Sequence, residues 1–189
     1  MTPEQFLQLL QQHSREIEQA IHRTLPVKVG AIAKAHFQDN FRQGGFVDGG
    51  LHPWQRTHRQ QSARGANGQY SPLMSSRQHL YGSISYTPAD AAVTVGTSVP
   101  YAGIHNDGGD IVVTERMKRF FWAKFHEANG NSWARKQSNP EADFWHLMAQ
   151  KKVGSTIHIP KRQFIGESRE LDKKVNQTID RELENIILK

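Results

Sequence analysis

Apolar residues recur at helical spacing over the first part of the chain. The first stripe follows an i, i+3, i+4 spacing and comprises Phe6, Leu9, Leu10, His13, Ile17, Ala20, Ile21 and Leu25. Thr2 and Pro3 suit the N-cap and the first helical position. A second stripe stops at the glycine pair 44–45 and comprises Val29, Ile32, Ala33, His36, Phe37 and Phe41. Because the residue before a proline avoids the α region, we expect Pro26 to break or restart the helix between the stripes.

The stretch 43–76 has no hydrophobic period of either 2 or 3.6 residues. It is poor in aliphatic side chains and rich in Gly, Gln, Ser, Arg and His. Loops of this length are uncommon inside a compact domain, and they are usually functional or ordered only on binding. We therefore predict a long loop over 43–76.

The centre of the chain contains several short strand candidates. Residues 83–87 and 91–96 flank the turn-rich tripeptide 88–90, which predicts a β-hairpin. Residues 110–114 (DIVVT) and 156–159 (TIHI) are two further candidates. Short strands separated by turns favour a small, mostly antiparallel β-sheet.

Helical spacing returns in the second half of the chain. Residues 115–128 repeat apolar positions at this spacing, and Pro140 begins a helix that runs to about Lys151. The C-terminal stripe, capped by Ser168, comprises Leu171, Val175, Ile179, Leu183 and Ile186. These elements predict an α+β fold in one domain, residues 1–189, with N-terminal helices, a small central sheet and a long C-terminal amphipathic helix.

The positive charge is concentrated in one segment of the 189-residue chain. The whole chain carries 24 Lys and Arg against 18 Asp and Glu, a net charge of +6. Residues 115–163 hold ten basic and four acidic side chains, so their excess of six equals the whole net charge. The absence of cysteine excludes thiolate metal sites and cysteine nucleophiles. No apolar run of membrane length and no signal-peptide pattern occur, so we expect an intracellular protein with no membrane partner.

The basic segment is also rich in aromatic side chains. Its candidate contact residues are Arg116, Lys118, Arg119, Trp122, Lys124, Lys151 and Lys152. Interleaved cations and aromatic rings can grip nucleic acid through phosphate contacts and stacking. They can equally form an amphipathic helix whose rings pack inward or against a neighbouring subunit. The second interpretation is favoured, because no nucleic-acid-binding motif surrounds the segment.

The chain contains ten histidines, which are common metal ligands and acid/base groups. His52 and His58 are six residues apart, but no established metal-ligand spacing accompanies them, and no metal or cofactor is expected. His105 and Asp107 could belong to a histidine-dependent nuclease or hydrolase. No nucleophile motif or carboxylate cluster is found, so we interpret residues 105–109 as a polar turn in which the glycines take positive φ.

Four segments in a fixed order resemble one known family. They are 77–86 (RQHLYGSISY), 93–96 (VTVG), 99–109 (VPYAGIHNDGG) and 159–166 (IPKRQFIG), followed by the terminal amphipathic helix. Together they resemble the phage virion morphogenesis family of Mu-like and related tailed phages. The resemblance covers about residue 70 to the end. The third and fourth segments are the most specific, and the basic stretch between them, 115–155, resembles an insertion.

The resemblance implies a structural role in the virion without catalysis. Family members are tail-completion or head–tail joining proteins that assemble as rings, often six-fold, in the bacterial cytoplasm. The expected partners are therefore further copies of the chain, other tail or head–tail connector proteins, and DNA passing through the lumen of the ring. An alternative is a basic DNA-binding protein of the same mobile element.

The resemblance also gives the two most specific segments a structural role. The motif residues concerned are Tyr101, Ile104, His105, Gly108, Gly109, Pro160, Arg162, Phe164 and Gly166. Tyr101 and Ile104 are expected to be apolar anchors, and the glycine pair 108–109 to reverse the chain. Pro160 and Phe164 would fix the chain before the last helix, and Arg162 would pair with a carboxylate or a carbonyl.

Overall fold

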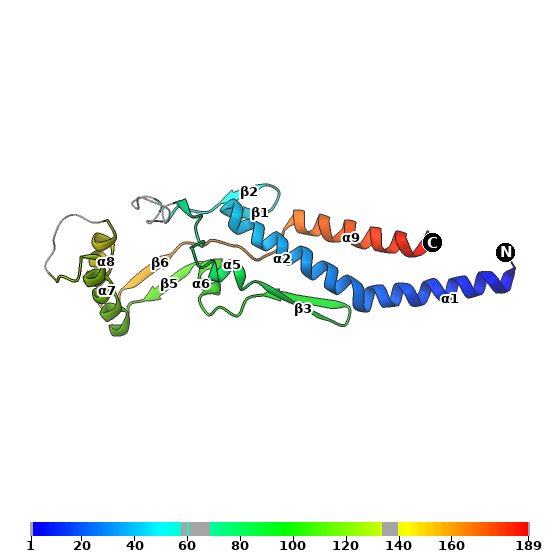
Figure 1. Cartoon of the computed structure of the whole chain (residues 1–189), viewed down its shortest axis with the longest axis horizontal. Helices are drawn as coiled ribbons and strands as arrows, with labels where there is room; N and C mark the ends of the chain where they lie inside the picture. Colours follow the sequence, from blue (N-terminus) through cyan, green and yellow to red (C-terminus); the bar gives the residue numbers. More distant parts are fainter. Residues whose placement is uncertain (1, 58–59, 61–68, 134–139, 189) are drawn as a thin grey trace.

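The chain folds into an elongated molecule with helices at both ends and shorter elements between them (Figure 1). The computed structural model describes residues 2–57, 60, 69–133 and 140–188. A long helical arm is formed near the N-terminus, a pair of helices lies at the opposite end, and short helices and ribbons fill the middle. Among the described residues, none of the helices combines the length and the hydrophobicity that a bilayer crossing needs.

The helical arm contains α1 (Pro3–Gln19), the π-helical turn η1 (Ala20–Thr24) and α2 (Leu25–Gln43). Thr2 caps α1 as predicted: its Oγ1 accepts a hydrogen bond from the Gln5 N–H at 3.2 Å, and the Gln5 side chain accepts one from the Thr2 N–H at 2.9 Å. Of the two predicted outcomes at Pro26, a break does not occur, because Leu25 keeps α-helical dihedrals; the α-helix instead restarts at Leu25, with Pro26 in its first turn. The Leu25 N–H instead bonds to Ala20, five residues back. This wider turn accommodates a proline ring that would collide with the carbonyl four residues before it in a regular α-helix.

The chain leaves α2 through Gly44, which has a left-handed φ of 69°. It then forms a small antiparallel ribbon of β1 (Gly45–Val47) and β2 (Leu51–Pro53). The prediction of an unstructured loop over 43–76 is therefore wrong for residues 45–53. Strands of three residues are too short to show an alternating pattern in the sequence. Part of this predicted loop, residues 58–59 and 61–68, lies outside the described residues.

The predicted hairpin is present as β3 (Ser85–Ala89) and β4 (Ala92–Gly96). Its turn is shorter than expected and consists of Asp90 and Ala91, where Ala91 has a φ of 50°. The hairpin packs on α2, where Gly30 leaves room for Tyr86, since a Cβ on Gly30 would overlap the Tyr86 ring. The strands are antiparallel as predicted, but they form three separate two-stranded ribbons and not one sheet.

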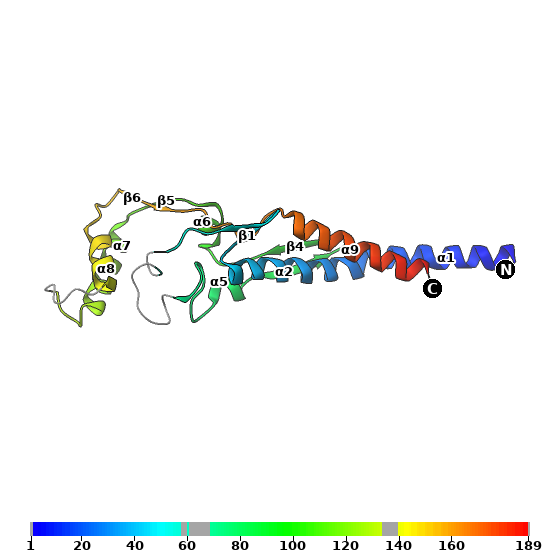
Figure 2. The same cartoon turned by 90° about the horizontal axis from the view of Figure 1, so that it is seen from above.

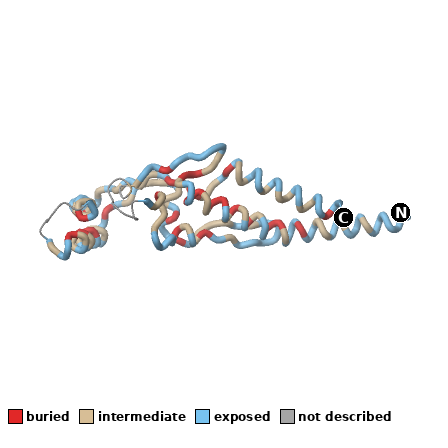
Figure 3. The backbone as a smooth tube through the Cα atoms, turned by 45° about the horizontal axis from the view of Figure 1, so that its top comes forward, coloured by how far each residue is buried: buried red, intermediate tan, exposed pale blue. Residues whose placement is uncertain are grey.

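The hydrophobic core lies where α2 meets the middle of the molecule, and Figure 3 shows buried residues there and a second group in the helices at the end opposite the N-terminus. Phe41 is fully buried and contacts the rings of Trp54, Tyr81 and Phe164, with centroid distances of 5.6, 6.1 and 5.0 Å. The short helices α5 (His79–Gly82) and α6 (Ala102–Asp107) add Leu80 and Ala102 to this core. The core therefore joins segments from the start, the middle and the end of the sequence.

The C-terminal helix α9 (Arg169–Ile187) packs along the arm and ends near the N-terminal half of α1 (Figures 1 and 2). Ser168 caps it as predicted, because its Oγ accepts a hydrogen bond from the Leu171 N–H at 3.3 Å. An ion pair between Lys28 and Glu182 ties α9 to α2. The predicted amphipathic helix thus has its apolar stripe turned toward the arm.

The other end of the molecule is a helical hairpin carried on a ribbon. Strands β5 (Gly109–Val112) and β6 (Thr156–Ile159) pair antiparallel, and between them come α7 (Glu115–Ala128) and α8 (Pro140–Gln150). The helix predicted over 115–128 and the strand predicted over 156–159 have the expected bounds. The expected N-cap of α8, Asn139, lies outside the described residues.

Removing the helical hairpin is expected to leave a folded protein. Val112 and Thr156 are paired neighbours on adjacent strands, so an Asn-Gly turn can replace residues 113–155 and close the ribbon. Because α7 and α8 pack mainly on each other, the midpoint of thermal unfolding followed by circular dichroism should change by only a few degrees. An aggregated product would show that the hairpin belongs to the core of the fold.

Candidate functional site: the junction of two motifs

The segments 99–109 and 159–166 meet in the middle of the molecule. The side-chain oxygen of Asn106 accepts hydrogen bonds from the backbone N–H groups of Phe164 at 2.9 Å and Ile165 at 3.0 Å. The backbone N–H of Arg162 donates a hydrogen bond to the backbone carbonyl of His105 at 2.8 Å. These three bonds hold residues 159–166 against α6. We call this arrangement the motif junction.

Gly108 and Gly109 let the chain turn from α6 into β5 beside the second motif. Gly108 has a φ of 74° and a ψ of 178°, and Gly109 has a φ of 143°, which are conformations that L side chains rarely adopt. A Cβ on Gly108 would lie 2.8 Å from the backbone nitrogen of Lys161. Gly108 is therefore required both by its dihedral angles and by the close approach of the two motifs.

The second motif is also held from the side of α2. Asn40 donates from Nδ2 to the Phe164 carbonyl at 3.1 Å and accepts from the Val47 N–H at 3.2 Å. The Trp54 indole N–H donates to the Gln163 carbonyl at 2.8 Å. Phe164 itself is 1% exposed. The backbone around Phe164 is thus fixed by hydrogen bonds from three different segments, which leaves its ring in the core.

Arg162 is buried, and its Nε donates to the Gln55 carbonyl at 3.1 Å. The expected partner was a carboxylate or a carbonyl, and the structure places a carbonyl there. The neighbouring motif residues Pro160 and Gly166 are both half-buried. A Cβ on Gly166 would overlap Nε2 of Gln163, so the absence of a side chain at Gly166 leaves room for the Gln163 amide.

Tyr101 does not lie in the core as the expected apolar anchor. Its side chain is 44% exposed, its hydroxyl lies 2.8 Å from Nδ1 of His79, and its ring contacts the His105 ring edge-on. A phenol at the surface can give its hydroxyl a polar partner, here His79, while its ring covers a neighbour, which explains the difference. Ile104 is half-buried, and its Cδ1 would lie 3.0 Å from a Cβ on Gly109.

His105 has a buried Nδ1 atom without a hydrogen-bond partner in the described part of the chain. Burial, and then the nearby Arg162 guanidinium, lower the pKa of His105 below its ordinary value. A lowered pKa favours the neutral imidazole at neutral pH. Asp107 accepts a hydrogen bond from Asn106, and the structure does not bring it to His105 as an acid/base pair would require.

The sequence did not predict a structural role for two residues of the motif junction, Asn40 and Asn106. Asn40 lies between Phe37 and Phe41 in the apolar stripe of α2, and a polar residue in such a stripe indicates a buried hydrogen bond. Asn106 lies within residues 105–109, which the sequence predicts to be a polar turn, and the structure places it in α6. Its partners are 58 and 59 residues away, and nothing in the local sequence indicates them.

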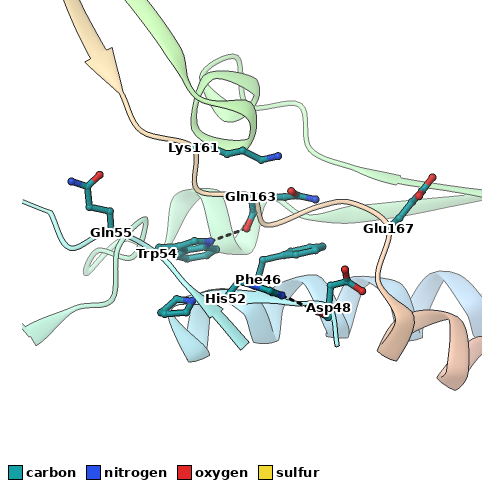
Figure 4. A pocket seen from close by; sticks show the side chains of 9 residues that line it. Phe46, Asp48, His52, Trp54, Gln55, Lys161, Gln163 and Glu167 are labelled. Carbon is teal, nitrogen blue, oxygen red and sulfur yellow. Dashed lines mark hydrogen bonds between the residues drawn. The ribbon is translucent and has the colours of Figure 1, made fainter. Parts of the chain in front are cut away.

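A shallow cavity of about 370 Å³ lies beside the motif junction, between the β1–β2 ribbon and residues 161–167. Figure 4 shows its lining, which combines the rings of Phe46 and Trp54 with polar side chains that include Asp48 and Glu167. Nε2 of His52 lies 2.9 Å from the Asp48 carbonyl oxygen. The His52 ring is therefore engaged with backbone and not with a carboxylate.

The cavity wall is anchored to the start of α9 by two carboxylates. Asp48 accepts hydrogen bonds from the Arg169 N–H and from its Nε, both at 3.1 Å, and Glu170 accepts one from the Gly49 N–H at 2.9 Å. The backbone hydrogen bond from Arg169 lowers the pKa of Asp48, and the one from Gly49 lowers the pKa of Glu170. These bonds fix the β1–β2 turn against the N-terminus of α9.

The aromatic residues of the basic segment mostly pack inside the helical hairpin. The Phe121 and Trp145 rings stack at 6.1 Å, and Phe125 contacts His146 at 5.0 Å. Trp122, expected as a contact residue, is half-buried and packs edge-on against His146. Lys124 forms an ion pair with Glu127 at 2.6 Å. The remaining expected cations, Arg116, Lys118, Arg119, Lys151 and Lys152, have no ion pair among the described residues.

The structure brings together no histidine cluster in the part of the chain that it describes. No group of three or more His, Asp or Glu side chains lies close enough there to hold a metal ion. The His126 ring contacts the Trp133 ring in a tilted arrangement with a centroid distance of 4.2 Å, and His58 lies outside the described residues. The motif residues that the structure unites therefore bind and position backbone.

The fold and the motif junction define an elongated α+β protein whose most specific sequence segments hold its own chain together. A family model for the phage virion morphogenesis family matches residues 3–184, nearly the whole chain. The protein belongs to the phage virion morphogenesis family. Searches of curated proteins and of solved structures gave no match.

Proposed function

We propose that this protein completes the phage tail or joins the tail to the head, without catalysis, as a ring of identical subunits. Six-fold symmetry is expected from the family resemblance. The protein assembles in the bacterial cytoplasm and stays in the virion, where it contacts other tail or connector proteins. Family membership supports the morphogenetic role.

The main observation that supports the proposed self-assembly is that apolar side chains are exposed at the end of the helical arm. No residue of α1 is fully buried, and Figure 3 shows this helix exposed along its outer part. The apolar side chains left at this end are Phe6 at 51% exposure, Leu7 at 57%, Leu10 at 49%, Ile187 at 56% and Leu188 at 81%. Residues 5–14 carry no Asp, Glu, Lys or Arg, and depletion of charge is typical of the core of protein interfaces.

A closed ring needs two different surfaces on each subunit that fit one another. The elongated shape supports this requirement, since the arm end and the helical hairpin lie at opposite ends of the molecule (Figure 2). Apolar side chains are also exposed on the hairpin, where Phe120 is 51%, Trp133 65% and Leu147 61% exposed. Exposed aromatic and aliphatic side chains of this kind are common anchors of protein interfaces.

Self-assembly is expected to depend on Leu10. Light scattering over a range of concentrations should give a multimer of fixed size, and Leu10→Glu should shift it toward the monomer by placing a charge in the interface. Gln8→Glu is the matched control, because it adds the same charge to an exposed position on the side of α1 that faces away from Leu10. A wild-type protein that stays monomeric at every concentration would contradict the proposed ring.

The role in the particle is tested with the same variants. A phage or prophage that lacks this gene should produce heads and tails that stay unjoined or incomplete in electron micrographs. Wild-type protein and Gln8→Glu should restore complete particles, and Leu10→Glu should not. Normal particles without the gene would disprove the morphogenetic role.

A further inference from the structure

The base of the helical hairpin brings together two segments that are distant in the sequence. The β5–β6 pairing continues past the strands, since the Val113 N–H donates to the Ser155 carbonyl at 2.8 Å and the Gly154 N–H to the Val113 carbonyl at 2.9 Å. The chain leaves this point into the first turn of α7 and returns to it from the end of α8 (Figures 1 and 2). The start of α7 and the end of α8 are therefore neighbours.

Five cations lie on these two neighbouring segments, and we call them the basal cluster: Arg116, Lys118, Arg119, Lys151 and Lys152. Glu115 is the single acidic residue of 115–120 and 150–154, so this base has a net charge of about +4. The remaining acidic residues of the two helices, Glu127, Glu141 and Asp143, lie toward the opposite ends of α7 and α8. The charge of the hairpin is thus separated along its length.

The cluster faces solvent. Arg116, Arg119 and Lys152 are exposed, and Lys118 and Lys151 are half-buried. Arg116, Arg119 and Phe120 are spaced i, i+3, i+4, which places them on one face of α7. None of the five cations forms an ion pair among the described residues. They are therefore available to a partner in solution.

Uncompensated like charges repel one another, and this repulsion is relieved when an anionic partner binds. Two helix ends packed side by side present cations about 10 Å apart. Duplex DNA carries one negative charge per about 1.7 Å of its axis, so a surface of this width meets several phosphates at once. An acidic protein surface seldom offers such a density of charge. Contacts to phosphates need no base-reading motif, which agrees with the absence of such a motif in the sequence.

We propose that the basal cluster of the helical hairpin is a sequence-independent binding surface for the phosphate backbone of duplex DNA. The contact is made by exposed Arg and Lys side chains from the two segments that the β5–β6 ribbon holds together. Binding of DNA to the isolated protein requires neither a ring nor a tail. The test below is therefore independent of the assembly experiments.

The test measures the affinity of the full-length protein for a short fluorescent DNA duplex by anisotropy as a function of salt. Wild type should bind, and log Kd should rise linearly with log salt concentration. The variant Arg116→Gln/Arg119→Gln/Lys152→Gln should bind at least about tenfold more weakly at ~0.1 M salt, with a slope smaller by about 2 to 3. A duplex of unrelated sequence should give the same values.

The matched control removes three exposed cations from the helical arm and α9, as Arg15→Gln/Lys173→Gln/Arg181→Gln. It lowers the net charge by the same amount and should change Kd by less than about twofold. Equal losses in the two triple variants would overturn the proposal, because net charge alone would then explain the affinity. Absence of wild-type binding, or displacement of DNA by polyglutamate at equal charge concentration, would overturn it as well. Circular dichroism of each variant verifies that the fold is retained.

Discussion

Replacing Gly108 by alanine is expected to lower the free energy of unfolding by about 3 kcal/mol or more. Its φ of 74° and ψ of 178° belong to a region that is essentially restricted to glycine. The new Cβ would also lie 2.8 Å from the Lys161 nitrogen and 3.0 Å from its Cα, which are backbone atoms that cannot rotate away. Chemical denaturation followed by circular dichroism measures the loss.

Gly103→Ala is the control for this substitution. Gly103 lies inside α6, five residues before Gly108, and a Cβ there meets nothing within 4 Å. Alanine is favoured over glycine inside a helix by about 1 kcal/mol, so this variant should be as stable as wild type or more stable. If the two variants unfold alike, the close approach of the two motifs is not what makes Gly108 necessary.

Phe164→Ala is expected to cost about 3–5 kcal/mol of stability. The ring is 1% exposed and lies 5.0 Å from the Phe41 ring, and its loss opens a cavity that cannot collapse easily. The surrounding backbone cannot follow, because Asn40 and Asn106 hold the carbonyl and the N–H of the same residue. Differential scanning calorimetry should show a lower melting temperature.

Phe120→Ala provides the comparison, since it removes the same ring from an exposed position. Phe120 is 51% exposed and contacts Trp145 only at one edge, so the expected cost is below about 1 kcal/mol. A small effect of both substitutions would mean that the motif junction adds little to the stability of the monomer. The two most specific motifs would then act mainly in contacts with a partner.

These expected results bear on how the family motif works. In this protein the motif glycines, Asn106 and Phe164 hold together α2, α6 and residues 160–168, which lead into α9. The exposed surfaces of the arm end and of the helical hairpin lie at opposite ends of the molecule, on either side of this junction. A rigid junction fixes the distance and angle between the two ends, which a subunit of a closed assembly requires.

The local structure was largely predictable because it depends on short-range physics. The bounds of α7 and β6, the cap of α1 by Thr2 and the cap of α9 by Ser168 follow from apolar periodicity and from side chains that bond to backbone three residues away. The sequence left open whether the helix breaks or restarts at Pro26, and the structure shows a restart without a break. The contacts of α2 with the β3–β4 hairpin favour a continuous helix. The π-helical turn Ala20–Thr24 makes room for the proline ring.

By itself the sequence determined the α+β class, most helices, the family and the segment that carries the positive charge. Only the tertiary structure decided that Asn106 bonds to Phe164 and Ile165, that the strands form three separate ribbons, and that Val113 pairs with Gly154 and Ser155 at the base of the helical hairpin. Periodicity and caps act over three or four residues and leave a pattern in the chain. Contacts between residues 58 to 124 positions apart depend on how the elements pack, and no local pattern encodes them.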